Sequence, residues 1–208
     1  MKRSTIRRVP SGGGWATLAA LLALPIHAHA HGQIQGFGDF GGGFVHPLLT
    51  PAHLLVLLGV GLWVGRQYTR LFRAMVLLCA SFSAIGLGLS NVALLPTAWQ
   101  ASLAVVALVL AALVIGEARL PAWASLPAIA LSALLIGLDS VVDAALPPLK
   151  VGLTLAGTWL AVNVCVVNIA YYVSQCPNRR WLQIGFRVAG SWIAAICLLV
   201  LAFSLRAS

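Results

Sequence analysis

Six long apolar runs, separated by short polar stretches, dominate the chain. They cover residues 46–65, 74–95, 97–116, 121–138, 150–173 and 185–205. Each run is close to the roughly 20 residues that a helix needs to cross the hydrocarbon core of a bilayer. Because lipid offers no partner to a backbone amide, each run is expected to be a helix. The pattern therefore predicts an all-α, polytopic membrane protein whose transmembrane domain of six helices covers residues 46–208.

The first 45 residues follow a different pattern. A basic start with Lys2 and Arg3 precedes an apolar stretch from Trp15 to Ile26, and the small residues of Ala28-His29-Ala30 follow it. This order is typical of a secretory signal peptide, here residues 1–30. An uncleaved anchor is the competing interpretation, although the apolar stretch is short for a span. Residues 31–45 are rich in glycine and are expected to form a flexible periplasmic lead-in.

The positions of the basic residues predict an orientation. A cleaved signal leaves the new N-terminus outside the cytoplasm, and six spans return the C-terminus to the same side. The loops then assigned to the cytoplasm, with their flanks, carry Arg66, Arg70, Arg73, Arg119, Arg179, Arg180 and Arg187, whereas the outer segments carry Lys150 and Arg206. This asymmetry follows the positive-inside rule. We expect a protein of the bacterial inner membrane with both mature termini in the periplasm.

The composition is typical of a membrane protein and limits the classes of partner that it can have. Hydrophobic residues make up 61% of the chain and charged residues 8%, and the mean hydropathy is +0.98. A net charge of +9 would suggest nucleic acid in a soluble domain, but here the arginines lie between apolar runs. We therefore exclude nucleic acid and expect the lipid bilayer as partner. The oligomeric state stays open, a homo-oligomer included.

His46 and His53 are the first candidates for chemistry. They stand seven positions apart, which places them within about 20° of one face of a continuous helix and roughly 10 Å apart along its axis. Thr50-Pro51 is a helix-start signal, but Pro47 would serve as well, so the segment is expected to be kinked near the outer membrane surface. Neutral imidazole binds nickel, cobalt, zinc and copper. The competing interpretation is a pair of interfacial or packing histidines.

Four further polar residues accompany the histidines. Asp139 closes the fourth run, where the helix dipole disfavours a negative charge, so a cation, a proton or a hydrogen-bond network is expected beside it. We take it as a third metal ligand, and the competing interpretation is a hydrated loop acid in the membrane interface. Asn91, Asp143 and Asn163 are candidates for lining a pathway, against the alternatives of a loop acid for Asp143 and a helix–helix contact for Asn163. Among the acids, Glu117 alone falls on the predicted cytoplasmic side.

The run from His46-Pro47 through His53 to Gly61 and Trp63 resembles the HupE/UreJ family of hydrogenase and urease accessory membrane proteins. The resemblance extends over essentially the whole chain. It implies a permease for nickel, or for nickel and cobalt. Two positions depart from the family pattern: Ala52 stands where an aspartate commonly precedes the second histidine, and no histidine follows His53 in a later motif.

The sequence thus predicts uptake of a divalent transition-metal ion, nickel or cobalt first, for the maturation of a metalloenzyme. His46, His53 and Asp139 would catch the ion, and no tightly bound cofactor is expected. The alternative is a non-transporting accessory or assembly protein, which the two departures favour. An enzyme is not expected, because the chain has neither a Gly-x-Ser-Gly segment with a later histidine nor a pair of cysteines in a CxxC motif.

Overall fold

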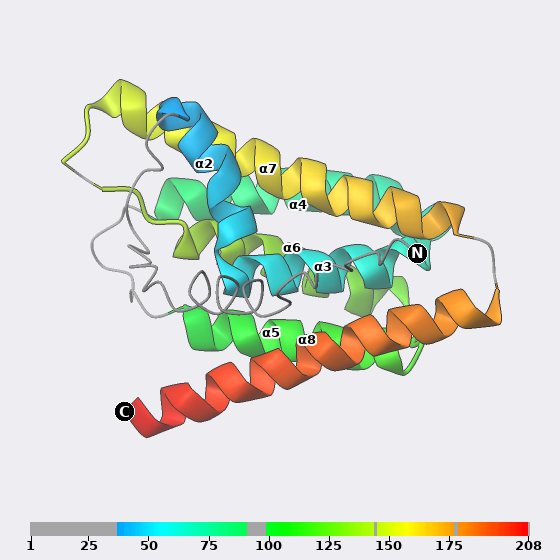
Figure 1. The fold of residues 1–208 in the computed structure, drawn as a ribbon. Coiled ribbons are helices and arrows are strands. Elements are labelled where there is room, and N and C mark those ends of the chain that lie inside the picture. The colour runs from blue at the N-terminus through cyan, green and yellow to red at the C-terminus, as the bar shows by residue number, and fades with distance from the viewer. Residues whose placement is uncertain (1–36, 91–98, 144, 177–178, 208) are drawn as a thin grey trace, which may run out of the picture. The chain divides into compact units, whose positions relative to one another are not determined.

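Seven helices and no strand make up the part of the chain that the computed structural model describes, namely residues 37–90, 99–143, 145–176 and 179–207 (Figure 1). The helices are α2 (Gly38–Leu49), α3 (Pro51–Gly65), α4 (Tyr68–Leu89), α5 (Gln100–Ile115), α6 (Ala122–Asp139), α7 (Pro148–Gln175) and α8 (Arg180–Ala207). The expected all-α fold is confirmed for these residues. The expected signal peptide, residues 1–30, lies outside them.

Length and composition identify four helical segments that can cross a membrane: Phe72–Leu89, Ala122–Asp139, Pro148–Gln175 and Arg180–Ser204. The bent pair of α2 and α3 makes a fifth if the two helices count as one span, and α5 is apolar but shorter. Five of the six apolar runs each correspond to one helix in the described residues, whereas the run 46–65 is divided between the end of α2 and α3. A count of six spans remains a prediction.

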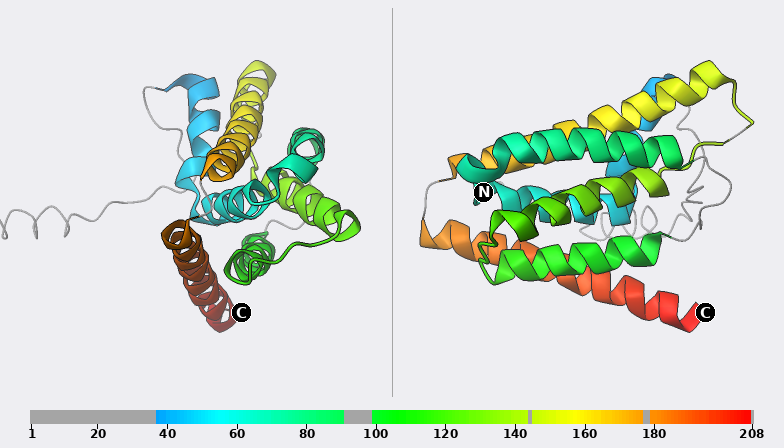
Figure 2. Two further views of the ribbon diagram at one scale, coloured as in Figure 1. Left: turned by 90° about the vertical axis from the view of Figure 1, so that its right-hand side faces the viewer. Right: turned by 180° about the vertical axis from the view of Figure 1, so that it is seen from behind.

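Helix α3 lies in the middle of the bundle (Figure 2). It is apolar all round, which is typical of a helix that other helices enclose. Eleven of its 15 residues are buried, among them Val56, Val60 and Trp63. The outer helices instead expose large apolar side chains such as Trp123 and Trp192, as expected of surfaces that face lipid rather than water. The sequence after His53 is therefore a core element.

The described part of the glycine-rich segment is helical rather than flexible, because residues 38–45 belong to helix α2, whereas residues 31–36 lie outside the described residues. Glycine has a low intrinsic helix propensity, but here it allows a close helix crossing. A Cβ atom on Gly43 would lie 2.0 Å from the backbone oxygen of Thr154, and one on Gly157 would lie 2.1 Å from that of Phe40. Helices α2 and α7 therefore pack backbone against backbone, and this packing outweighs the propensity of the sequence.

A bend of 72° separates α2 from α3. Thr50 ends the first helix and precedes the second, and its backbone N–H and its hydroxyl both donate to the backbone oxygen of His46, at 3.0 and 2.9 Å. Of the two expected helix starts, the one at Pro51 is confirmed and the one at Pro47 is wrong. Pro51 has no N–H to continue α2. The expected kink is present at this point.

Pro47 lies inside α2, where its missing N–H leaves the backbone oxygen of Gly43 without its helical donor. The hydroxyl of Thr158 on α7 donates to that oxygen at 3.0 Å. In a bilayer an unsatisfied carbonyl is costly, so this hydrogen bond explains how a proline is accommodated within the helix. It also fixes α2 against α7 next to the bend.

Candidate functional site

The bend brings His53 to the end of helix α6. His53 lies in the first turn of α3 and is fully buried, and Asp139 is the last residue of α6, with 11% of its side chain exposed. The Nε2 atom of His53 is 2.9 Å from Oδ2 of Asp139. A carboxylate at a helix C-terminus is electrostatically unfavourable. The imidazole is therefore the compensating group that the sequence predicts beside Asp139.

Close packing fixes the end of α6 that carries Asp139. A Cβ atom on Gly86 of α4 would lie 2.4 Å from the backbone oxygen of Leu134, and one on Gly137 would lie 2.8 Å from the Cα atom of Gly86. Ser140, the residue after the helix, donates its hydroxyl to the backbone oxygen of Ile136 at 2.7 Å. The carboxylate is therefore held on a rigid element rather than on a mobile loop.

The same bend brings His46 to His53. Their ring centroids are 5.4 Å apart and the rings meet edge to face, at 78°. The spacing predicted that the two residues share one face of a continuous helix. This is wrong, because His46 lies on α2 and His53 lies on α3. The 72° bend shortens the separation of roughly 10 Å that a straight helix would impose. His46, His53 and Asp139 thus follow one another in a row with His53 at its centre.

The hydrogen bond to Asp139 determines which ring nitrogen of His53 is available. When the carboxylate is ionised and the ring is neutral, Nε2 carries the hydrogen, because a carboxylate only accepts, and Nδ1 then has a lone pair. Nδ1 is buried and has no hydrogen-bond partner among the described residues. Leaving such a group unsatisfied costs about 1–3 kcal/mol. A carboxylate that orients one ring nitrogen while the other is vacant is the arrangement found around metal-binding histidines.

The row is an open arrangement rather than a cage. Within the described ranges, no group of three or more histidine, cysteine, aspartate or glutamate side chains is placed to hold a metal ion. Two imidazoles flank one another and the carboxylate lies behind one of them. Structural zinc sites usually have four protein ligands. The row therefore offers two imidazole rings and one carboxylate, but no closed set of ligands.

The three remaining candidates do not join this row in the described structure. Asn91 lies outside the described residues. Asp143 accepts the backbone N–H of Ala145 at 2.9 Å, within its own loop. Asn163 on α7 donates to the backbone oxygen of Trp159 at 2.8 Å and to the hydroxyl of Ser83 on α4 at 3.4 Å. Asn163 thus makes a contact between helices, and pathway lining stays a prediction for all three.

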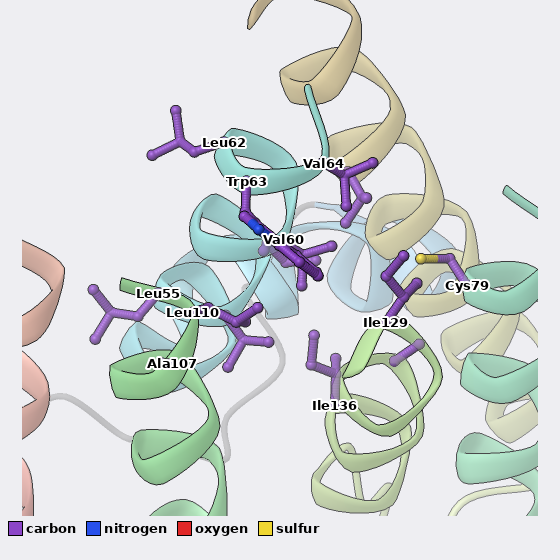
Figure 3. Close-up of a cluster of buried hydrophobic side chains, with 14 of the residues drawn as sticks. Leu55, Val60, Leu62, Trp63, Val64, Cys79, Ala107, Leu110, Ile129 and Ile136 are labelled. Atoms are coloured by element: carbon purple, nitrogen blue, oxygen red, sulfur yellow. The ribbon is translucent and has the colours of Figure 1, made fainter. Parts of the chain in front are cut away.

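An apolar layer lies between this site and the other end of α3. Side chains of α3, α4, α6 and α7 enclose a void of about 10 Å³, lined mainly by Leu57, Val60, Cys79, Ile129, Ile136, Val162 and Val166. Figure 3 shows Val60, Ile129 and Ile136 in this part of the core, with Cys79 near them. A void of this size holds one water at most, and an apolar lining favours an empty one. The site is therefore closed on the side that faces the core of the bundle.

Sequence reasoning missed a second polar cluster, beyond the apolar layer. It contains Arg66 at the end of α3, Glu117 after α5 and Gln183 on α8. The positive-inside rule accounts for an arginine at this position, so its sequence context gave no reason to expect a specific contact. A signal was present in Gln183 and Glu117, which are polar residues beside apolar runs, but neither has a spacing that indicates a partner.

The sequence model of the family described as HupE / UreJ protein matches residues 18–200. The matched segment includes His46, His53 and Asp139 and also Arg66 and Glu117. No curated protein and no solved structure matches the chain.

Proposed function

Because the chain belongs to the HupE/UreJ family, we propose that it is an accessory membrane protein that takes up a divalent transition-metal ion for the maturation of a metalloenzyme. Nickel and cobalt are the first candidates. The observation that carries this proposal is the buried Nδ1 atom of His53, which has no hydrogen-bond partner among the described residues. The ring of His53 contacts the ring of His46, and its other nitrogen, Nε2, is hydrogen-bonded to Asp139. Imidazole nitrogen is a good ligand for these metals.

In the proposed capture step, the ion exchanges part of its water shell for imidazole nitrogen. His53 would supply Nδ1 and His46 would supply a second nitrogen from the other side of the bend. Asp139 keeps the hydrogen of His53 on Nε2 and makes the ring a stronger ligand, as carboxylates behind metal-bound histidines do. In this proposal Asp139 is an orienting residue and not a direct ligand. With two protein ligands the ion is held loosely, as a cargo must be.

In the proposed transport step, the ion crosses the apolar layer below His53. Charge cannot enter a dry apolar constriction without a large penalty, so α3 must move relative to α6 and α7 to admit water. The bend between α2 and α3 is a suitable hinge, because Pro51 leaves the backbone there without continuous helical hydrogen bonds. The distribution of arginines favours capture in the periplasm and release in the cytoplasm.

A metal-uptake panel tests this function. Bacterial cells that express the protein are incubated with radiolabelled nickel, cobalt, zinc or copper and compared with cells that carry an empty vector. We expect accumulation of nickel or cobalt above the vector level, with zinc and copper lower. Equal accumulation of all four metals with and without the protein would contradict a transport function.

Asp139→Asn is expected to lower uptake about 10- to 100-fold, the loss typical when a carboxylate behind a metal-bound histidine is replaced. The amide still fits the space, but it no longer favours a hydrogen on Nε2 of His53. Asp39→Asn is the matched control, since Asp39 lies in the first turn of α2 and is not part of the row of His46, His53 and Asp139. Initial uptake rates at several metal concentrations separate a loss of affinity from a loss of maximal rate. Equal rates in the two variants would argue against an orienting role.

A non-transporting accessory or assembly role is the second candidate function. The open row of ligands and the closed apolar layer favour it, because neither requires passage of an ion. This role implies a stable partner that co-purifies with the protein from native membranes. It also implies that metalloenzyme maturation is indifferent to both histidines. If maturation of the metalloenzyme requires His53, the result favours transport over an assembly role.

A further inference from the structure

The end of α3 that is remote from His53 borders a polar pocket. The pocket has a volume of about 330 Å³, and its lining includes Trp63, Arg66, Glu117, Arg119 and Gln183. Such a volume has room for several waters. Val60, one turn before Trp63 on α3, already lines the apolar void (Figure 3). Only about 5 Å of helix axis therefore separates the residues that line the pocket from those that line the void.

Two side chains at the end of α3 hold the chain around the end of α5. The indole N–H of Trp63 donates to the backbone oxygen of Ala118 at 3.0 Å. Arg66 directly follows α3, and its Nη1 donates to the backbone oxygen of Val114 at 3.1 Å. Val114 belongs to the last turn of α5, where carbonyl groups lack a helical donor. The end of α3 thus supplies donors to the end of α5.

The Arg66 guanidinium extends this contact to a third helix. Its Nη2 lies 3.2 Å from Oε1 of Glu117 and also donates to Oε1 of Gln183 on α8. Only 16% of the Arg66 side chain is exposed, against 46% for Glu117. A largely buried charge is costly to separate from its partners. Trp63, Arg66, Glu117 and Gln183 therefore form a latch that attaches the end of α3 to α5 and α8.

Glu117 has an unusual backbone conformation. Its φ is 54°, and it is the only residue other than glycine with positive φ in the described part of the chain. The N–H of Glu117 donates to the backbone oxygen of Val114 and that of Ala118 to Leu113, which is the pattern of a Schellman motif, where glycine is usual. A glutamate there is strained, and such strain concentrates at functional sites. The backbone of Glu117 thus opposes folding while its carboxylate contributes to the latch.

We propose that this latch is the inner gate of the ion path. It holds the end of α3 against α5 and α8 and keeps the apolar layer closed between transport events. Because the bend before Pro51 acts as the hinge, a tilt of α3 moves the latch end of the helix farthest. Trp63 and Arg66 then leave their acceptors, and water from the pocket reaches the void. The inference rests on the proposed transport function and adds the element that controls it.

Cys79 reports opening without a transport measurement. Its side chain is 2% exposed and lines the void in the apolar layer, so a charged thiol reagent reaches it only together with water. Cys197 on α8 is also buried, at 0% exposed, but it is not among the residues that line the void. The full chain, purified in detergent without metal, is treated with a cationic methanethiosulfonate, and peptide mass spectrometry follows both cysteines. Opening of the gate exposes Cys79 alone, whereas general loosening exposes both.

Arg66→Gln removes the cation of the latch. We expect Cys79 to react at least tenfold faster than in the wild type and Cys197 to stay within twofold. Arg119→Gln is the matched control, because Arg119 lines the same pocket but is exposed and lies outside the latch. It should leave both rates within twofold of the wild type. An equal rise at both cysteines in Arg66→Gln would overturn the gate in favour of a structural clamp.

Glu117→Gly separates gating from stability, and it also serves if Arg66→Gln does not give a monodisperse protein. Glycine adopts a φ of 54° without strain, but the variant lacks the carboxylate that pairs with Arg66. We expect an unfolding temperature in detergent equal to or above that of the wild type, together with a rate at Cys79 at least threefold higher. A lower unfolding temperature with a parallel rise at Cys197 would again mean a clamp.

The two proposals fail in different ways. Absence of metal uptake by the wild type overturns the transport function, and the inner gate with it. Wild-type uptake together with a Cys79 rate within twofold of the wild type in both Arg66→Gln and Glu117→Gly overturns the gate alone.

Discussion

His53→Ala is expected to reduce metal uptake to the level of cells without the protein. The substitution removes Nδ1, the buried nitrogen that has no other partner among the described residues. It also removes the ring that contacts both His46 and Asp139. Uptake of radiolabelled nickel or cobalt, corrected for the amount of protein in the membrane, measures the effect. Uptake at the wild-type rate would rule out the row of residues as the capture site.

The same substitution is expected to destabilise the protein for a separable reason. Asp139, with 11% of its side chain exposed, would lose its hydrogen-bond partner at the unfavourable end of a helix dipole, at a cost of about 1–3 kcal/mol. His53→Ala/Asp139→Ala removes both partners and should recover part of this loss without recovering uptake. Thermal unfolding in detergent measures the stability of each variant. Recovery of uptake in the double variant would mean that the pair serves stability only.

The length of the apolar runs predicted the helices from α3 to α8, because in a bilayer a long apolar run has no alternative to the helix. Helix α2 could not be predicted in this way. Its glycines have a low helix propensity. The close crossing of α2 and α7 at Gly43 and Gly157 explains why this segment is nevertheless helical. The pattern around Pro47 and Pro51 predicted a kink, but its angle depends on how α2 packs on α7.

The candidate site was predictable as a set of residues and not as an arrangement. His46, His53 and Asp139 stand out in the sequence because ionisable groups are rare in apolar runs. The contact between His53 and Asp139 joins residues 86 positions apart, and no local pattern encodes it. The role of Arg66 was hidden for another reason: an arginine at a span end already has an explanation in topology, so its contact with Glu117 requires tertiary structure.

Gly157→Ala is expected to be strongly damaging although the residue lies away from the site. The added Cβ would lie 2.1 Å from the backbone oxygen of Phe40 and 2.8 Å from the backbone nitrogen of Phe44. Backbone atoms cannot give way by a change of rotamer, so α2 must move away from α7. The hydrogen bond from Thr158 to the backbone oxygen of Gly43 would then break. Overpacking of this kind typically costs about 1–3 kcal/mol.

The displacement of α2 should also impair function, because α2 carries His46 while His53 and Asp139 lie on α3 and α6. Metal affinity should therefore fall although both remaining residues keep their contact. Gly152→Ala is the matched control on the same helix, since a Cβ there would meet nothing within 4 Å, and it should be neutral or stabilising by about 0.5–1 kcal/mol. Unfolding temperature and cobalt affinity, measured on both variants, distinguish the two positions. Equal values would show that the close crossing of α2 and α7 does not position His46.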